Sequence, residues 1–594
     1  MRSAIGRLKN QNIIGLDIET TGLDPINDRI LLIQVGTAEE VFVCDVQALG
    51  KQAFHLIHLI SNPGIVKLGQ NLSFEWAFLE AFGMPLRGRL LDTMIAGKLL
   101  NLGLKVPNSL DALVRRHLGI AMEDKKELQK SFIGHEGPFS DEQLAYAAMD
   151  VSICFPLWEK LKKLLRKEEL SHIFRLECRA LAAFASMKTN GFLLNVDYYK
   201  QLLVDKQCER DTAKKILLEQ FVEAGVLDKY KNPATGCVMV DPESYGKGKN
   251  KRKGFNVGST MQLQPVLRAM GVPIENSLDK NVLAWLSPDH SIVRDYMGFK
   301  ELNTACSQVE KLIGHAEKHT DHRIRANYRQ LGTDTGRASC AGPNLQQVKR
   351  DAEYRRGFIA APGCVLVIAD YSQLELRIAA ECSGEEKMTQ AYLEGADLHT
   401  RTASLMLGVA EEDVQKPDRT SSKIINFGAL FGSGAKSIRQ QAATQYKVIF
   451  TLEEAEKKLG LWREAYPQLI GWQQDQGNSI GPVYTLMGRR RLLTPGPGGS
   501  DKYTTRLNTQ VQGTGGDCMK AALALLWEQY LSIKPSWKLV ANVHDEAVLE
   551  VPEDDADEAQ VVLKECMESA AYEVCLTKIP IVAEPGSGKD WSAK

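Results

Sequence analysis

Two aspartates far apart in the chain each adjoin an apolar run of the kind that forms a buried strand. Residues 365–369 lead into Asp370, and a predicted hairpin of 539–543 and 547–551 carries His544, Asp545 and Glu546 at its turn. If these strands pair, the carboxylates of Asp370 and Asp545 meet at one edge of a sheet. There they could hold two Mg²⁺ ions about 3.5–4 Å apart, which would stabilise both oxygens of an in-line phosphoryl displacement. The alternative is that both aspartates only cap turns.

A second set of candidate residues recurs every four positions in the stretch RTSSKIINFGALFG. Arg419, Lys423 and Phe427 therefore share one face of a predicted helix. An arginine fork and a lysine ammonium one turn apart can grip a triphosphate, and Phe427 offers a flat apolar surface to a sugar or base. The alternative is a solvated basic face with one buried aromatic side chain.

A third set lies in the first half of the chain. Asp17 and Glu19 in GLDIETTG are two positions apart on a predicted strand, so both side chains point to one face. Tyr146 and Asp150 in LAYAAMD are four positions apart on a predicted helix and also share a face. Asp17, Glu19 and Asp150 could share two metal ions for phosphodiester hydrolysis. The alternative is a set of surface acids.

The elements that would position these residues fall into successive regions. Residues 1–168 alternate apolar strands with helices and end in a charge cluster, so we place a domain boundary near 168–172. Helical patterns follow, and one of them ends at Asn190-Gly191. Residues 229–254 are rich in Gly, Pro and Lys, as in a loop. From about residue 355, mixed strands and helices indicate an α+β unit.

Composition narrows the class of protein only slightly. The 594 residues carry a net charge of −1 and a pI of about 6.8, which neither requires nor excludes a basic nucleic-acid groove. The 12 cysteines form no C-x-x-C pair, so we expect neither a zinc cluster nor a disulfide framework. No apolar run approaches the ~20 residues of a membrane span, and the first residues lack the apolar core of a secretory signal.

The stretches around Asp370, Arg419 and Asp545 resemble motifs A, B and C of family A DNA polymerases, the family of bacterial DNA polymerase I. TDTGRASCAGPNLQQ, ADLHTRTAS, LNTQVQGTGGD and the ending GKDW resemble further family motifs, so the resemblance covers essentially the whole chain. It implies that Asp370 and Asp545 bind two Mg²⁺ ions, with Glu546 as a catalytic neighbour. It implies dNTP binding by Gln373, Glu375, His399, Arg419, Lys423, Phe427 and Phe431. It implies contacts with primer and template by Arg337, Asn344, Gln346, Arg377, Asn508, Gln512 and His544.

Three of these residues would govern selection of the nucleotide sugar. The resemblance implies that Glu375 is the steric gate that excludes a ribose 2′-OH. Phe427 occupies a position where the family carries Phe or Tyr, and Phe431 one where it usually carries Tyr. Phe431 cannot offer Glu375 the hydroxyl that the family tyrosine supplies. We therefore expect a looser gate, unless water or another side chain replaces that partner.

The first half resembles the 3′→5′ exonucleases of the DEDD superfamily in their tyrosine form. Asp17 and Glu19 match the first motif, GQNLSFEWAFL the second, and Tyr146 with Asp150 the third. The resemblance implies that two metal ions are bound by Asp17, Glu19, Glu75 and Asp150. It also implies that Tyr146 places the attacking water. Glu75 departs from the family, which carries Asp there. We expect attenuated exonuclease activity, and the alternative is an inactive domain kept as a scaffold.

The resemblance also implies an architecture and partners. An α/β RNase H-like exonuclease domain (1–170) would precede an α+β right-hand polymerase (171–594), with no 5′-nuclease domain in front. The expected thumb is about 195–320, the palm about 325–385 and 517–594, and the fingers about 386–516. We expect a monomer that binds primer-template DNA and dNTPs but no membrane. Its place would be the cytoplasm of a bacterium or phage-infected cell, associated with the nucleoid, or an organelle. The sequence identifies no processivity partner.

Three other functions are alternatives to a DNA polymerase, and each conflicts with particular residues. A free-standing exonuclease with a binding module leaves Asp370, Asp545 and Arg419 unexplained, and a DNA-binding protein without activity would not need them intact. A single-subunit RNA polymerase conflicts with Glu375, which would crowd a 2′-OH.

The stretch KGKNKRK at 247–253 could contact duplex phosphates, or it could be a solvated loop.

Overall fold

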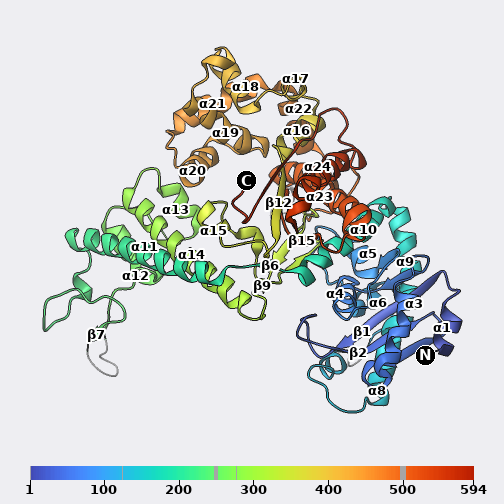
Figure 1. The fold of residues 1–594 in the computed structure, drawn as a ribbon. Coiled ribbons are helices and arrows are strands. Elements are labelled where there is room, and N and C mark those ends of the chain that lie inside the picture. Colours follow the sequence, from blue (N-terminus) through green and yellow to red (C-terminus); the bar gives the residue numbers. More distant parts are fainter. Residues whose placement is uncertain (1, 123–124, 246–251, 276, 495–502) are drawn as a thin grey trace. The chain divides into compact units, whose positions relative to one another are not determined.

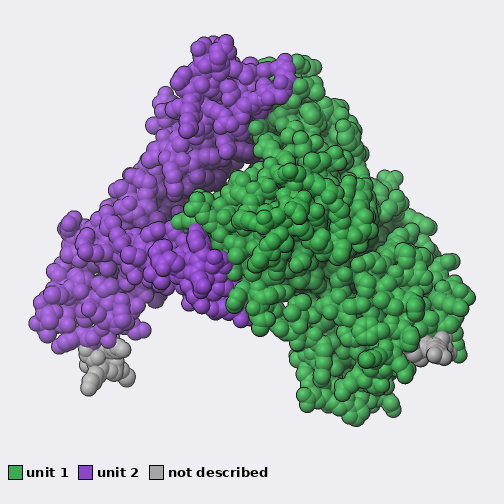
Figure 2. All heavy atoms as spheres, in the orientation of Figure 1, with its two compact units in different colours: residues 1–194, 319–393, 471–594 green, residues 195–318, 394–470 purple. Residues whose placement is uncertain are grey.

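The computed structural model describes residues 2–122, 125–245, 252–275, 277–494 and 503–594, which form two compact units (Figure 2). Unit 1 consists of residues 1–194, 319–393 and 471–594, and unit 2 of residues 195–318 and 394–470. The expected exonuclease and palm ranges fall in unit 1, and almost all of the expected thumb in unit 2. The expected fingers range is divided between the two units. Among the described helices, none has the length and apolar character needed to cross a membrane.

The first sheet of unit 1 has five strands in the order β3-β2-β1-β4-β5. Its strands β1 and β2 are labelled in Figure 1. The strands β1, β2 and β3 pair antiparallel, while β4 and β5 continue the sheet in parallel. Their bounds are β1 Ile13–Thr20, β2 Ile30–Gly36, β3 Val41–Asp45, β4 Val66–Gly69 and β5 Leu90–Asp92. The accompanying helices include α1 Arg2–Leu8, α2 Val46–Leu49, α3 Ile57–Ile60, α4 Ser73–Ala81, α5 Thr93–Leu100, α6 Leu110–Leu118, α7 Lys125–Lys130, α8 Asp141–Ser152 and α9 Cys154–Lys167. This mixed arrangement confirms the α/β class expected for the first domain.

Burial explains why the first sheet forms where the apolar runs predict it. Every residue of β2 is buried, as expected for an inner strand covered on both faces. The helix α8 packs against β1, β2 and β3. One face of α8 therefore lies next to β1, the strand that carries Asp17 and Glu19. The first sheet therefore positions both halves of the predicted exonuclease site.

The second sheet of unit 1 is antiparallel, with four strands in the order β15-β16-β12-β17. Its bounds are β12 Cys364–Tyr371, β15 Lys538–Val543, β16 Glu546–Pro552 and β17 Ala583–Gly588. The surrounding helices are α16 Leu374–Ser383, α17 Glu386–Leu393, α23 Tyr503–Leu526 and α24 Ala556–Glu573. The predicted hairpin is confirmed, because only His544 and Asp545 separate β15 from β16.

A single helix, α10 (Ser171–Asn190), contacts elements of both sheets in unit 1. It packs against α4 and α5 on one side and against α23 and β15 on the other. It ends at Gly191, whose φ of +60° is unfavourable for residues with a side chain, so the predicted helix end is confirmed.

Unit 2 is almost entirely helical. The long helices α11 (Val196–Glu223) and α14 (Ser291–Ala316) pack along each other. The other helices are α12 Thr260–Ala269, α13 Lys280–Leu286, α18 Leu398–Leu407, α19 Lys416–Leu430, α20 Ala435–Gln445 and α21 Leu452–Ala465, and α22 (Pro467–Asn478) leads back into unit 1. In the lysine-rich stretch, Lys247, Lys249 and Lys251 lie outside the described residues, as does the Arg252 side chain. The Lys253 backbone pairs with Ser244 between the short strands β8 (Arg252–Lys253) and β7 (Ser244–Tyr245).

Candidate functional site

The predicted pair of aspartates meets at the edge of the second sheet. In the β12–β16 register, Asp370 lies opposite Glu546, and the Tyr371 amide donates to the Asp545 carbonyl at 3.1 Å. The two-residue turn is completed by His544, whose φ is +58°. The hairpin thus brings Asp545 beside the strand end that carries Asp370, as the sequence predicts.

Cationic side chains already accompany both aspartates. The Lys594 ammonium forms an ion pair with Asp370, and Arg350 lies 3.7 Å from Asp545. Within the described residues, no three His, Cys, Asp or Glu side chains gather closely enough to hold a metal ion by themselves. Mg²⁺ commonly uses only one or two carboxylates together with substrate phosphates, so this pair of carboxylates fits such an ion.

Glu546, predicted as a catalytic neighbour of the aspartates, has other partners. One carboxylate oxygen accepts from Arg355 at 2.9 Å and the other from the Trp591 indole at 2.7 Å. Its side chain is almost fully buried. The contact with Trp591 links the C-terminal segment to β16.

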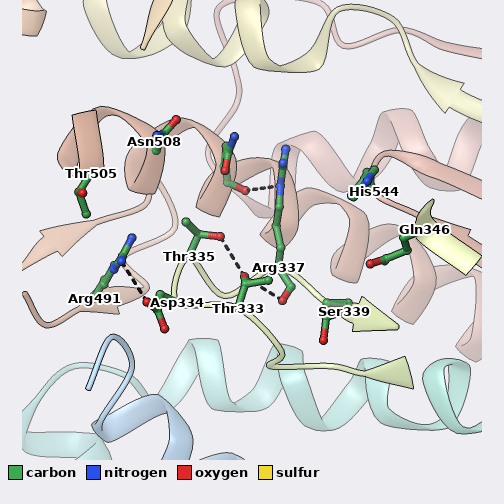
Figure 3. A pocket seen from close by; sticks show the side chains of 12 residues that line it. Thr333, Asp334, Thr335, Arg337, Ser339, Gln346, Arg491, Thr505, Asn508 and His544 are labelled. Atoms are coloured by element: carbon green, nitrogen blue, oxygen red, sulfur yellow. Dashed lines mark hydrogen bonds and ion pairs between the residues drawn. The ribbon is translucent and has the colours of Figure 1, made fainter. Parts of the chain in front are cut away.

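A groove of about 440 Å³ gathers most of the predicted DNA-contacting residues of unit 1 (Figure 3). Five of these residues line it, although they come from four separate segments of the chain: Arg337, Gln346, Asn508, Gln512 and His544. Burial lowers the pKa of His544, and the nearby Arg337 charge adds to this effect. The groove therefore combines two arginines and one carboxylate with neutral polar groups, a set suited to contacting sugars, phosphates and base edges.

Arg337 links this groove to the predicted steric gate. Its Nε donates to the Gln512 carbonyl at 3.1 Å, and its Nη2 donates to Glu375 at 2.7 Å. Phe431 cannot supply the tyrosine hydroxyl, and Arg337 gives Glu375 a partner, as in the alternative that another side chain replaces it. Gln373, just before α16, has a left-handed backbone (φ +53°) and accepts from the Tyr392 hydroxyl at 3.2 Å.

Two predicted DNA-contacting residues do not line the groove. Asn344 caps a short 3₁₀ helix by accepting from the Gln346 amide at 3.0 Å. Arg377 is buried, donates to the carbonyls of Ser372 and Pro580, and lies over the Tyr392 ring. Arg377 therefore ties α16 to the protein interior.

The groove also contains residues that the sequence did not single out. Thr333, Asp334 and Thr335 belong to the TDTGR stretch, and Thr505 precedes Asn508 by nearly one helical turn. Arg491 ends the run GRRR and donates to Thr509 at 2.8 Å. A cluster of three arginines after a glycine is a signal for phosphate contact that could have identified this residue.

Four charged side chains form a fully buried network behind the groove. Arg489 lies 2.5 Å from Glu177 and 2.6 Å from Asp517, and Lys520 lies 2.5 Å from Glu177. The Lys520 ammonium also donates to the carbonyl of Gly336, next to Arg337, at 2.6 Å. The network thus connects α10, α23 and the loop that carries Arg337.

Asp517→Ala is expected to lower the free energy of unfolding by about 3–5 kcal/mol, because it leaves Arg489 buried with one charge partner fewer. Urea unfolding followed by circular dichroism measures this change. The matched control is Glu558→Ala, which removes an exposed carboxylate paired with Lys534 and should cost less than about 1 kcal/mol. Equal losses in the two variants would contradict this account of the network.

In unit 2, the predicted cationic face is present on α19. Arg419 grips Asp397 with two hydrogen bonds, at 2.8 and 3.1 Å, and Asp397 caps the start of α18. Burial alone would raise the pKa of Asp397, but the bonds from Arg419 and Thr400 outweigh it and lower the pKa to about 2. Lys423 and Phe427 follow Arg419 at successive helical turns, and the Phe427 ring lies 5.7 Å from the His399 ring. Arg419 is thus held at one end of the predicted triphosphate-binding face.

His399 is buried beneath this face, where its Nδ1 lies 3.0 Å from the Asn426 amide. Burial lowers its pKa to about 4; Asp397 opposes this shift, and Arg419 and Lys423 add to it. His399 is therefore neutral at pH 7. A neutral imidazole can act as a hydrogen-bond donor to a phosphate without adding charge.

The His399 environment predicts a loss of stability in acid. The unfolded chain binds a proton at its ordinary pKa near 6.5, whereas the folded protein resists protonation down to about pH 4. The free energy of unfolding should therefore fall by roughly 3 kcal/mol as pH decreases from 6.5 to 4 on account of this group. Urea unfolding at several pH values measures the slope. A His399→Gln variant with the same slope as the parent would contradict this assignment.

The predicted exonuclease residues are also brought together. Glu75, on α4, hydrogen-bonds to Asp17 on β1, and burial followed by the Asp17 charge raises its pKa well above the ordinary range. Its Oε2 is buried and has no hydrogen-bond partner among the described residues. On α8, Tyr146 hydrogen-bonds to Asp150, and its pKa is raised by burial and then by Asp150 and Glu19. The unsatisfied oxygen of the Glu75–Asp17 pair offers a ligand to a cation, although within the described residues no three such side chains gather closely enough to hold a metal ion by themselves.

Comparisons with known proteins agree with this geometry. The family model described as DNA polymerase family A matches residues 245–593, and the model described as 3'-5' exonuclease matches residues 1–166. DNA polymerase I of Aquifex aeolicus is 32% identical over 619 residues, covering 100% of this chain and 98% of that protein. The chain spans only 62% of DNA polymerase I of Chloroflexus aurantiacus, at 26% identity over 99% of its own length.

A solved structure shares the fold. It is the "POL domain of Pol1 from M. smegmatis complex with DNA primer-template and dNTP", with a TM-score of 0.81 and 21% identity, covering 100% of this chain and 98% of that one. Both sheets, the two sets of carboxylates and the family matches lead to one assignment. The chain belongs to DNA polymerase family A, as a DNA-directed DNA polymerase that carries a 3′-5′ exonuclease domain.

Proposed function

We propose that this polymerase adds dNTPs to the 3′ end of a primer under the direction of a template strand, by two-metal phosphoryl transfer. The observation that carries the proposal is the pairing of β12 with β16, which places Asp370 beside the turn holding Asp545. The groove that contains Arg337 and His544 adds a surface for the primer-template near that turn.

Each side chain has a defined part in this proposal. Asp370 and Asp545 hold two Mg²⁺ ions, which when bound stabilise charge on the attacking and leaving oxygens. Arg419, Lys423 and neutral His399 bind the triphosphate, and Phe427 lies against the sugar or base. Glu375, oriented by Arg337, excludes a 2′-OH, while Gln373 and Phe431 complete the nucleotide site.

The proposed contacts with primer and template are assigned to the residues lining the groove. Contact with primer and template is proposed for Arg337, Gln346, Asn508, Gln512 and His544. Asn344 and Arg377 support these contacts by shaping the backbone. We retain the thumb, palm and fingers ranges given above as the proposed domains. The enzyme acts as a monomer in the cytoplasm, near the nucleoid.

The exonuclease domain is proposed to proofread at an attenuated rate. Asp17, Glu19, Glu75 and Asp150 hold up to two Mg²⁺ ions, and Tyr146 positions the attacking water. The extra methylene of Glu75 shifts its carboxylate by about one bond length from where Asp would place it, and Mg²⁺ tolerates little distortion. An inactive scaffold is the second candidate for this domain.

Primer extension with Mg²⁺ and either dNTPs or NTPs tests the polymerase proposal. We expect efficient extension with dNTPs and at least about a hundredfold less with NTPs, since ~2.7 kcal/mol of discrimination corresponds to that ratio. Comparable extension with both would favour an RNA polymerase instead. No extension with either would favour a DNA-binding protein without activity.

Phe427→Tyr is expected to increase incorporation of dideoxynucleotides by at least about tenfold. A tyrosine hydroxyl could make a hydrogen bond that replaces the one lost with the 3′-OH, and one such bond to a charged group contributes about 1.5–3 kcal/mol. Chain-termination frequency at a fixed ratio of ddNTP to dNTP measures the effect. Phe431→Tyr is the matched control, and equal termination by Phe427→Tyr and the parent would refute the prediction.

A further inference from the structure

A second cavity of unit 1, about 860 Å³ in volume, is lined by none of the candidate catalytic carboxylates. Its walls come from the exonuclease domain, α10 and the end of α23. Two aromatic pairs line it: Trp76 contacts Trp527 edge-on at 5.3 Å between ring centroids, and Trp158 lies 5.1 Å from Phe174. Specific ligand sites commonly have volumes of about 300–1,000 Å³ and walls of this aromatic character.

The wall that carries Trp527 has an unusual backbone. Residues Trp527–Leu531 form a π-helical turn directly after α23, in which the Ser532 amide donates to the Trp527 carbonyl at 3.1 Å. Such widened turns are rare and often mark functional positions. Ile533, just beyond the turn, lines the same cavity and is 72% exposed, so apolar surface continues out of the cavity onto the protein exterior.

The cavity is lined by six cationic side chains and by one carboxylate, that of Glu528. Arg87, Lys162 and Arg179 are paired with nearby glutamates. Arg89, Arg166 and Arg175 also line it, are exposed, and make no side-chain hydrogen bond or ion pair within the described part of the chain. These three arginines come from three elements: the approach to β5, the last turn of α9 and the first turns of α10.

The aromatic floor has an unmet hydrogen-bonding group. Trp76 is 2% exposed, and its indole Nε1 has no partner among the described residues. A buried unsatisfied donor costs about 1–3 kcal/mol, and buried tryptophan N–H groups usually find an acceptor. A ligand that reaches this nitrogen gains a hydrogen bond that the free protein lacks.

We propose that this cavity binds a short acidic segment of a partner protein. One aromatic side chain of the segment enters among the Trp and Phe rings, and its carboxylates lie near Arg89, Arg166 and Arg175. Three arginines without a carboxylate partner among the described residues suit several carboxylates along a peptide better than the single anionic group of a nucleoside monophosphate. The apolar surface leading out to Ile533 likewise suits an extended chain.

The test uses the whole 594-residue chain and a fluorescein-labelled peptide in which several aspartates adjoin one phenylalanine. Fluorescence anisotropy should show saturable binding, and replacing the peptide phenylalanine by alanine should weaken it at least about tenfold. Arg166→Glu combined with Arg175→Glu should also weaken binding at least about tenfold. The matched control is Lys163→Glu, an exposed charge reversal on α9 that does not line the cavity, and it should change binding less than about twofold.

Primer extension by all variants should stay at the parent rate, which shows that they are folded. Absence of peptide binding, or equal weakening by Lys163→Glu, would overturn the proposal, since the latter indicates general charge attraction. Displacement of the peptide by dAMP, with dAMP binding lost in the double arginine variant, would assign the cavity to a nucleotide and also overturn it.

Discussion

Asp370→Ala and Asp545→Ala should each lower the rate of nucleotide addition by at least about a thousandfold. Each substitution removes one of the two carboxylates that the β12–β16 pairing brings to the sheet edge. Loss of a metal ligand removes several kcal/mol of transition-state stabilisation, and ~4 kcal/mol corresponds to a factor of a thousand. Single-turnover extension of a labelled primer in Mg²⁺ measures the rate.

DNA binding separates a catalytic defect from a structural one. Both variants should bind primer-template within about threefold of the parent, because the groove around Arg337 is unchanged. Asp554→Ala is the matched control, since it removes an exposed aspartate shortly after β16. Near-parental extension by either Asp370→Ala or Asp545→Ala would remove these residues from the metal site.

Glu75→Asp should raise the rate of 3′→5′ degradation by about tenfold, while Asp17→Ala should lower it by at least about a hundredfold. Glu75 is packed on α4 with 3% exposure, so its surroundings give the longer side chain little room to adjust. Catalytic groups need placement within about 0.5 Å, and an aspartate at this position restores the geometry expected for the family. Removal of a 3′-mismatched nucleotide in the absence of dNTPs measures both effects.

A conservative change elsewhere on the same helix provides the control. Glu80→Asp shortens a half-buried glutamate that pairs with Arg87, and it should leave the exonuclease rate unchanged. If the parent, Glu75→Asp and Asp17→Ala all fail to degrade the primer, the domain is an inactive scaffold. A parent that is already fast and gains nothing from Glu75→Asp would refute the geometric argument.

Local patterns in the sequence predicted the parts of the site that local structure determines. The hairpin with His544 and Asp545 at its turn follows from two apolar runs separated by polar residues. The α19 face follows from the four-residue spacing of Arg419, Lys423 and Phe427. These features depend on residues close together in the chain, so spacing alone defines them.

The remaining contacts join residues that are distant in the chain, and no local pattern encodes them. Glu546 binds Trp591, and Arg337 binds Glu375, through side chains whose meeting depends on the tertiary fold. The buried Glu177–Arg489–Asp517 network is of the same kind. Arg377 is different, because it lies two positions after Glu375 on α16. Residues with that spacing point to different sides of a helix, so the sequence could have indicated that Arg377 faces inward.

Insertion of a single nucleotide tests most directly whether nucleotide addition is directed by a template. Four primer-templates differing only in the first templating base are each offered the four dNTPs separately, with Mg²⁺. We expect rapid insertion of the complementary dNTP on each template, and insertion by Asp370→Ala that is slower by at least about a thousandfold. Insertion that ignores the templating base, or that stays near the parent rate in Asp370→Ala, would contradict this expectation.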